Sequence, residues 1–499
     1  MSRRRGWTRP ALRVGALMAA YLLAPRASAH AFGARYDLPL PLGLYLGGAG
    51  AAVALSFVVT AGFLRGASGT LIEARLRLDG LAPARWLMHP LCLGAARAVA
   101  VALFLLVVAA GFLGSQDTFK NLAPTMVWVI WWVGFAYVSA LIGDLWALVN
   151  PWSVLFACAE RLNARLGGGP LSWYRSYPTR LGAWPAVALF AAFAWLELVS
   201  AGAERPAPLA GLIVGYSLVT WGGMLAYGRD AWLRHGEVFS VAFGLLARFA
   251  PTEVRPTHAG GRAGAGLYLR PYATGLLSER PLSVSMLMFV LVMLATVTLD
   301  GFLETAAWAN LLDWVASEPG LRATLLTLRA WGFDLLAVIE TIALMAFPLL
   351  FLGVYLLVAW LASRAAGGPL GAVAVARSLV LSLVPIAIAY HLAHYLSYLL
   401  LAGQLIIPLA SDPFGAGWDL FGSAGYRMDL SVVDARFAWY TAVSAIVLGH
   451  VIALYLAHVM ALRLFGEVRA AVRSQVPVAA LMVGYTAVSL WILSQPIVE

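Results

Sequence analysis

Charged side chains are scarce in this chain. Asp, Glu, Lys and Arg make up 12% of its 499 residues, whereas hydrophobic residues make up 62%. A soluble protein of this length would need more polar residues to cover its surface. The scarcity therefore excludes a water-soluble globular protein, and the many apolar runs of about 20 residues match helices that cross a bilayer. The sequence predicts an all-α integral membrane protein surrounded by lipid.

Cysteine and lysine are nearly absent as well. The two cysteines, Cys92 and Cys158, both fall near predicted cytoplasmic helix ends, so we expect reduced thiols and no disulfide. Lys120 is the single lysine, and arginine supplies every other fixed positive charge. The chain also lacks a nucleotide-binding motif, which argues against an ATP-driven pump.

The first 29 residues have the pattern of a cleaved signal peptide. Arg3, Arg4 and Arg5 form a basic n-region, "VGALMAAYLLA" forms a short apolar h-region, and "ASA" (27–29) is a small-residue cleavage site. The segment holds six arginines and no acid, so cleavage lowers the formal net charge from +10 to +4. We therefore expect no nucleic-acid binding. Cleavage would expose His30, whose amine and imidazole could chelate copper.

Residues 30–499 are predicted to form a single polytopic membrane domain with about ten spans. Arginines gather in every second loop, as the positive-inside rule requires. This bias places both termini outside the cytoplasm. A GC-rich bacterial genome would explain the preference for arginine over lysine, and we expect the protein in a bacterial inner membrane. The expected spans are 40–64, 92–114, 125–149, 184–202, 209–227, 282–302, 332–361, 379–408, 437–462 and 477–497.

Several segments outside or at the ends of the spans have their own patterns. Residues 231–249 have apolar residues at helical spacing and are expected to lie in the inner interface. The segment 303–316 could cap the bundle on the outer side. The Gly- and Arg-rich stretch 257–266 is typical of a flexible cytoplasmic loop. The tryptophans of "VWVIWW" (127–132) are typical of an aromatic belt near the outer end of a span.

Ionisable side chains within spans are the candidates for function, because hydrocarbon disfavours them. A rise of about 1.5 Å per residue places four of them near the middle of the bilayer. These are Glu340, His391, His394 and His450. Glu197, Asp300, Glu304 and Asp334 lie further out, whereas Asp144 and His458 lie toward the cytoplasm. Asp144, in "GDLWALVNPW" (143–152), is expected to pair with Asn150 or Arg97.

The midplane group suggests a metal site. His391 and His394 are three residues apart, so both project from one helix face. Helical bundles build metal sites from such imidazoles together with carboxylates of neighbouring helices. We predict that His391, His394, His450 and Glu340 bind a divalent transition metal: Zn, Fe, Mn or Cu. The alternative is that the histidines form only hydrogen bonds between helices.

Such a metal could convert a bound water molecule to hydroxide at neutral pH. The predicted catalytic residues are Asp300 and Glu304, which are four residues apart on one helix face. Asp300 or Glu340 could act as a general base, and Asp300 or Glu304 could orient the attacking water molecule.

Two stretches, "HAFGARYDLPLPLGLYLGGAGAAVALSFVV" (30–59) and "GDLWALVNPW" (143–152), resemble a bacterial membrane-protein family whose members often carry the name fenitrothion hydrolase. The resemblance runs along the whole chain. It implies hydrolysis of an organophosphorus triester by a membrane-bound enzyme, and it supplies no residue assignments. A lipophilic triester could reach a site inside the bundle directly from the bilayer.

Two other functions remain open. A proton-coupled or metal-ion transporter would also place polar side chains at the midplane of several spans. A haem protein would use His391 or His394 opposite His450 as axial ligands. The sequence favours metal-dependent hydrolysis narrowly over these alternatives.

Overall fold

The computed structural model describes residues 40–64, 74–259, 262–278, 280–368 and 370–495. Within these ranges, nine helices are long and apolar enough to cross a bilayer, so the prediction of an all-α membrane protein is confirmed. The signal segment and His30 lie outside the described residues. The nine spans are α2 (Leu42–Phe63), α5 (Pro90–Leu113), Leu122–Leu141, α11 (Pro206–Tyr227), α14 (Val284–Leu303), α17 (Leu335–Ala365), Ala372–Ser411, α21 (Ala435–Phe465) and α22 (Val468–Leu493).

The remaining predicted span, 184–202, forms the shorter helix α10 (Trp184–Leu198) of 15 residues. At about 1.5 Å per residue this helix is roughly 22 Å long, less than a hydrocarbon core of roughly 30 Å. It packs against α14 and against α13 (Val238–Ala247). A helix too short to span alone is therefore held against longer neighbours, and its outer end lies within the bundle.

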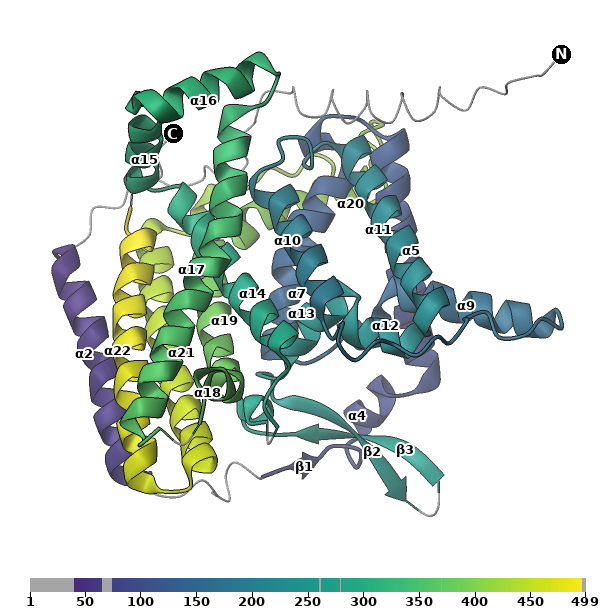
Figure 1. Ribbon diagram of the computed structural model, residues 1–499. Helices are drawn as coiled ribbons and strands as arrows, with labels where there is room; N and C mark the ends of the chain where they lie inside the picture. Colours follow the sequence, from purple (N-terminus) through teal and green to yellow (C-terminus); the bar gives the residue numbers. More distant parts are fainter. Residues whose placement is uncertain (1–39, 65–73, 260–261, 279, 369, 496–499) are drawn as a thin grey trace, which may run out of the picture.

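The spans form two groups with a central layer between them (Figure 1). In the first group, α2, α17 and α21 pack against α22. In the second group, α5 packs against α11. The helices α14 and α19 (Val384–Ala402) lie between the groups, next to α7 (Phe135–Leu141) and α13. The candidate site is in this central layer.

The segment Leu122–Leu141 is irregular. It begins with α6 (Leu122–Pro124), continues as the π-helix η2 (Thr125–Gly134) and ends as α7. A π-helix closes its hydrogen bonds between residues i and i+5, so its side chains do not follow the ordinary helical period. Trp131 and Trp132 consequently pack inside the bundle, against Phe239 and Phe193. The prediction of an aromatic belt is wrong for these two tryptophans.

The segment Ala372–Ser411 is also interrupted. It consists of α18 (Ala372–Leu379), the 3₁₀ segment η4 (Val380–Leu383), α19, the 3₁₀ segment η5 (Gly403–Leu405) and α20 (Ile406–Ser411). Pro385 lies in the first turn of α19, where its missing N–H removes a backbone hydrogen bond to the preceding turn. The break at η4 therefore separates α18 from the part of the segment that carries the histidines.

Residues 231–249 do not form the surface helix that the sequence predicted. They belong to two helices, α12 (Arg229–His235) and α13, joined at Gly236 and Glu237. A Cβ atom on Gly236 would lie 2.5 Å from the Trp232 ring, so glycine permits this close turn. Because "VFSVAFGLLA" is apolar apart from Ser240, α13 is buried against α7 and α10 rather than placed at an interface.

A small antiparallel sheet with strand order β1-β3-β2 lies at the end of the bundle opposite α15 and α16 (Figure 1). Its strands are β1 (Leu76–Arg77), β2 (Thr252–Ala259) and β3 (Arg262–Leu269). The prediction of a flexible loop at 257–266 is thus wrong for the described residues of that stretch. Glu253 of β2 holds the sheet through ion pairs with Arg75 (3.1 Å), Arg255 (3.0 Å) and Arg270 (3.5 Å).

Shorter helices complete the described chain. The helices α15 (Ala306–Ser317) and α16 (Pro319–Ala330) join α14 to α17 at one end of the bundle (Figure 1), and the outer position expected for 303–316 stays a prediction. The others are α4 (Ala82–Leu87), α8 (Trp146–Val149) and α9 (Pro151–Arg165), with 3₁₀ turns η1 (Thr118–Lys120), η3 (Thr274–Leu276) and η6 (Leu430–Val432).

Candidate functional site

Asp300 of α14 is the centre of a buried polar cluster. Its Oδ2 atom lies 3.0 Å from Nε2 of His394, and the same oxygen accepts a hydrogen bond from the Tyr395 hydroxyl. The side chains of His394 and Asp300 are only 11% and 9% exposed. Both donors come from adjacent residues of α19. The structure therefore brings together two of the predicted site residues, Asp300 and His394, through one carboxylate oxygen.

Two further carboxylates act on this cluster. Glu197 lies near the end of α10, and Glu304 follows α14 one turn beyond Asp300. The charges of both residues are close enough to affect His394. We call Glu197, Asp300, Glu304, His394 and Tyr395 the acid–histidine cluster.

Glu197 has a fixed position because Trp132 of η2 donates its indole N–H to Oε1 across 2.7 Å. The Trp132 ring packs edge-on against Phe193, with 4.6 Å between ring centroids. The sequence reasoning missed Trp132 because its tryptophan-rich segment resembled an interfacial belt. The one available signal was depth, since Trp132 and Glu197 were both expected in the outer part of their spans.

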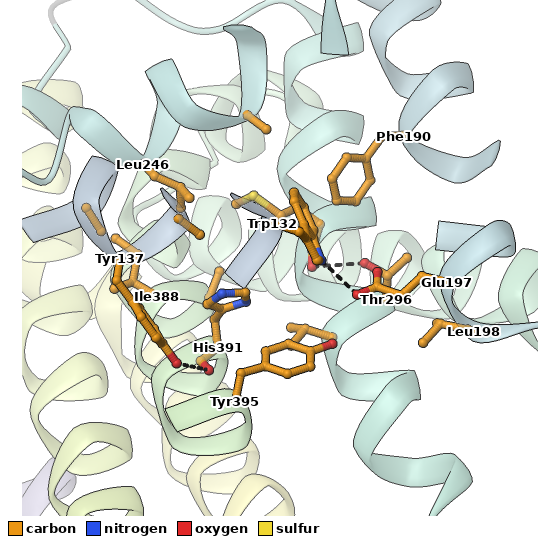
Figure 2. A pocket seen from close by; sticks show the side chains of 16 residues that line it. Trp132, Tyr137, Phe190, Glu197, Leu198, Leu246, Thr296, Ile388, His391 and Tyr395 are labelled. Atoms are coloured by element: carbon orange, nitrogen blue, oxygen red, sulfur yellow. Dashed lines mark hydrogen bonds between the residues drawn. The ribbon is translucent and has the colours of Figure 1, made fainter. Parts of the chain in front are cut away.

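His391 has one ring nitrogen without a partner. Its Nε2 atom is buried and makes no hydrogen bond. The ring packs against Tyr137 and Tyr395, with centroid distances of 5.2 and 4.7 Å. The Tyr137 hydroxyl donates to the backbone carbonyl of His391 across 3.0 Å, which joins α7 to α19. Figure 2 shows the imidazole between Tyr137 and Trp132.

His391, Glu197 and Tyr395 line a cavity of about 50 Å³. Since one water molecule needs roughly 10–15 Å³ by this measure, the cavity has room for roughly three to five. Its walls come from η2, α7, α10, α13, α14 and α19 (Figure 2). Apart from His391, Glu197, Tyr395, Tyr137 and Thr296, the lining is apolar: Trp132, Ala136, Ala140, Phe190, Leu198, Ala242, Leu246, Met293, Val297, Ala387 and Ile388.

The other predicted metal ligands lie on other helices. His450 of α21 is fully buried, and its Nδ1 atom bonds to the carbonyl of Ile446 (2.8 Å) within its own helix. Its ring packs against Tyr485 of α22 at 5.7 Å. Glu340 is buried on α17. His394 engages Asp300, as described above.

The described part of the chain contains no group of three or more His, Cys, Asp or Glu side chains that could hold a metal ion. The donor set His391, His394, His450 and Glu340 does not form such a group in this arrangement. A resident metal therefore stays a prediction, and we derive no chemical step from one.

The expected pairing of Asp144 is wrong. Asp144 accepts a hydrogen bond from the backbone N–H of Ala147 (3.1 Å), and Arg97 donates to the carbonyl of Leu148 (3.0 Å). Asn150 donates instead to Oε2 of Glu237 at 3.2 Å.

Glu237 is a buried acid that the sequence reasoning placed at an interface. It is fully buried at the start of α13 and accepts backbone N–H groups of Phe239 (3.0 Å) and Ser240 (2.7 Å). The Tyr216 hydroxyl donates to Oε1, the oxygen that also accepts the Phe239 N–H. With all these donors, Glu237 is a structural cap that holds α13 inside the bundle.

No family model, curated protein or solved structure matches the chain. The resemblance to proteins named fenitrothion hydrolase therefore stays a prediction. Function has to be argued from the geometry of the acid–histidine cluster and the cavity.

Proposed function

We propose that this protein is a proton-coupled membrane carrier in which the acid–histidine cluster takes up and releases the proton. The observation that carries the proposal is the hydrogen-bonded set formed by His394, Tyr395 and one oxygen of Asp300 beside the cavity. Ionisable groups inside a bilayer are costly, and proton relays are among their commonest functions. In this proposal the carrier lies in a bacterial inner membrane with both termini outside the cytoplasm.

A proton on this cluster changes the charge of a site shielded from water. When His394 is protonated and Asp300 is ionised, the pair has no net charge. Loss of that proton leaves an uncompensated carboxylate among apolar walls, which a low-dielectric interior strongly disfavours. The neighbouring helices can reduce this cost by admitting water or a cation. Proton binding is thereby coupled to what the cavity contains.

Interrupted helices around the cavity support a carrier over a rigid enzyme. The walls include α13, which begins at a break inside the bundle, and α19, which follows the 3₁₀ segment η4. Many transporters bind their substrates where helices are discontinuous near the bilayer midplane. The π-helix η2 adds a third irregular wall, and π-helical turns are frequent at functional sites.

Hydrolysis of an organophosphorus triester is less well supported by the geometry. Sites for drug-sized ligands occupy about 300–1,000 Å³, whereas this cavity has about 50 Å³. A triester would enter only after α13 or α19 had moved. Hydrolysis stays the prediction of the resemblance, and release of nitrophenol from such a triester by the purified protein would test it.

The carrier proposal is tested by proton movement into vesicles. Purified full-length protein is reconstituted into phospholipid vesicles that contain a pH-sensitive dye, and valinomycin-mediated potassium efflux makes the interior negative. We expect faster acidification than in protein-free vesicles, and loss of this excess in Asp300→Asn. Asp144→Asn is the matched control, because asparagine can still accept the Ala147 N–H. Equal rates for wild type, Asp300→Asn and protein-free vesicles would overturn the proposal.

A further inference from the structure

Glu197 is the one acid that lines the cavity, and it forms no ion pair with a described residue. Asp300 has His394 at 3.0 Å, whereas no Lys, Arg or His of the described residues forms an ion pair with Glu197. The hydrogen bond from Trp132 fixes one Glu197 oxygen but brings no charge. Inside apolar walls a carboxylate must be neutralised, either by a proton or by a cation.

The polar atoms of the cavity offer acceptors rather than donors. The Tyr395 hydroxyl donates to Asp300, the Tyr137 hydroxyl to the backbone of His391, and the Thr296 hydroxyl to the Met293 carbonyl. Their hydrogens are therefore already used. The Nε2 atom of His391 has no partner and accepts a hydrogen bond when the imidazole hydrogen is on Nδ1. With Glu197 ionised, a ligand of this cavity should therefore be a hydrogen-bond donor and not an anion.

The walls and the volume restrict the ligand further. Trp132, Tyr137, Phe190 and Tyr395 contribute aromatic rings, whose faces attract cations. About 50 Å³ admits roughly three to five water-sized groups. Alanines at 136, 140 and 242 leave apolar space beside the polar groups. This combination suits an ammonium group with a short hydrocarbon tail.

We infer that the cavity is a binding site for a small protonated primary amine of about one to three carbons, a size set by the water-scale volume. The ammonium N–H groups donate to Glu197 and His391, and the alkyl tail lies against the alanine-lined wall. Glu197 then carries either a proton or the ammonium ion. Binding of the amine does not itself require transport. The inference rests on the proposed carrier function in one respect only: in a carrier, the exchange of the proton for the ammonium ion on Glu197 is the coupling step.

Equilibrium dialysis of the detergent-solubilised full chain with radiolabelled methylammonium tests the site. We expect saturable binding, competition by ethylammonium and propylammonium, and no competition by acetate or by tetramethylammonium, which has no N–H donor. Glu197→Gln keeps an oxygen for the Trp132 N–H but loses the charge. It should lower the affinity at least about tenfold, as expected for loss of a charge-assisted hydrogen bond.

Glu160→Gln is the matched control, because Glu160 pairs with Arg229 at 3.6 Å outside the cavity. Loss of this ion pair should leave methylammonium binding unchanged. A second variant, Ala136→Leu, fills the cavity without altering its charge and should also abolish binding. Thermal unfolding of each variant reports whether it is folded. Absence of saturable binding, or equal binding by Glu197→Gln and wild type, would overturn the inference.

The two proposals can fail separately. Glu197-dependent binding of methylammonium without any Asp300-dependent acidification of vesicles would contradict the carrier and leave the cation site intact. Asp300-dependent acidification without amine binding would contradict the cation site alone.

Discussion

Trp132 donates its indole hydrogen to Glu197 across 2.7 Å and thereby joins the π-helix η2 to the end of α10. The bond aims the carboxylate at the cavity that His391 and Tyr395 also line. A residue type usually found at membrane interfaces thus positions an acid inside the bundle.

Loss of this hydrogen bond should weaken cation binding. Trp132→Phe keeps most of the aromatic packing and removes the donor. A hydrogen bond to a charged group contributes about 1.5–3 kcal/mol, so methylammonium affinity should fall roughly tenfold to hundredfold. Dialysis with radiolabelled methylammonium measures the change. Trp128→Phe is the control. Trp128 donates to the carbonyl of Ala203 (3.3 Å), so this variant should bind methylammonium as tightly as wild type. An equal loss in both variants would contradict a specific role for Trp132.

Removal of the Tyr395 hydroxyl should slow proton transfer without unfolding the protein. Tyr395→Phe removes one of the two contacts to Oδ2 of Asp300 and keeps the other, from His394. We expect the acidification of vesicles to slow by roughly tenfold, the effect of about 1.4 kcal/mol. The control is Tyr355→Phe, which removes another buried hydroxyl, bonded to the carbonyl of Ala376 at 3.1 Å. Unchanged acidification in Tyr395→Phe would remove this phenol from the pathway.

Close packing at Gly301 should be essential to the cluster. A Cβ atom there would lie 2.7 Å from the Tyr390 hydroxyl and 2.9 Å from Cγ2 of Ile492. Gly301→Ala should therefore push α14 away from α19, at a cost of about 1–3 kcal/mol for overpacking. The melting temperature should fall and proton transfer should slow.

The matched control is Gly353→Ala, since a Cβ at Gly353 meets nothing within 4 Å. Alanine stabilises a helix by about 1 kcal/mol relative to glycine, so this variant should melt at the same or a higher temperature. If both variants behaved alike, the contact at Gly301 would have no special importance.

Acid should loosen the small sheet at the end of the bundle. Burial alone would raise the pKa of Glu253, but the hydrogen bond from Arg255 and the charges of Arg270 and Arg75 outweigh it and lower the pKa below its ordinary value. Such a carboxylate stabilises the folded state fully above its ordinary pKa, and the contribution is lost as pH falls through the lowered pKa.

We therefore expect the backbone amides of β2 and β3 to lose hydrogen-exchange protection below about pH 4. Glu253→Gln removes the titrating group, so protection in that variant should be weaker at neutral pH and should change less with acid. The same acid-dependent loss in wild type and variant would contradict the assignment to Glu253.

Much of the fold could be predicted because spans leave a simple signal in the sequence. Runs such as α5 and α14 are uniformly apolar over the length of a bilayer, and nine of the ten expected spans match long helices in the described chain. What could not be predicted was irregular helix geometry. The π-helix η2 and the break at Gly236 depend on contacts with other helices, which a periodicity of 3.6 residues does not reveal.

The candidate site was only partly predictable for the same reason. Depth along the spans placed His394 near the middle and Asp300 further out, and the structure brings them into contact. Depth says nothing of direction, however, and it did not reveal that His450 bonds to the carbonyl of Ile446 within its own helix. Trp132 was missed because the π-helix turns a residue of an apparent interfacial belt toward Glu197.

The central claim is that the Asp300–His394 pair exchanges protons across the bundle. Internal pH of vesicles, recorded after an inside-negative potential is imposed, tests it most directly. The account predicts that wild type and Asp144→Asn acidify the lumen faster than lipid alone, and that Asp300→Asn does not. Wild-type vesicles that acidify no faster than lipid alone, or an Asp300→Asn variant as fast as wild type, would contradict it.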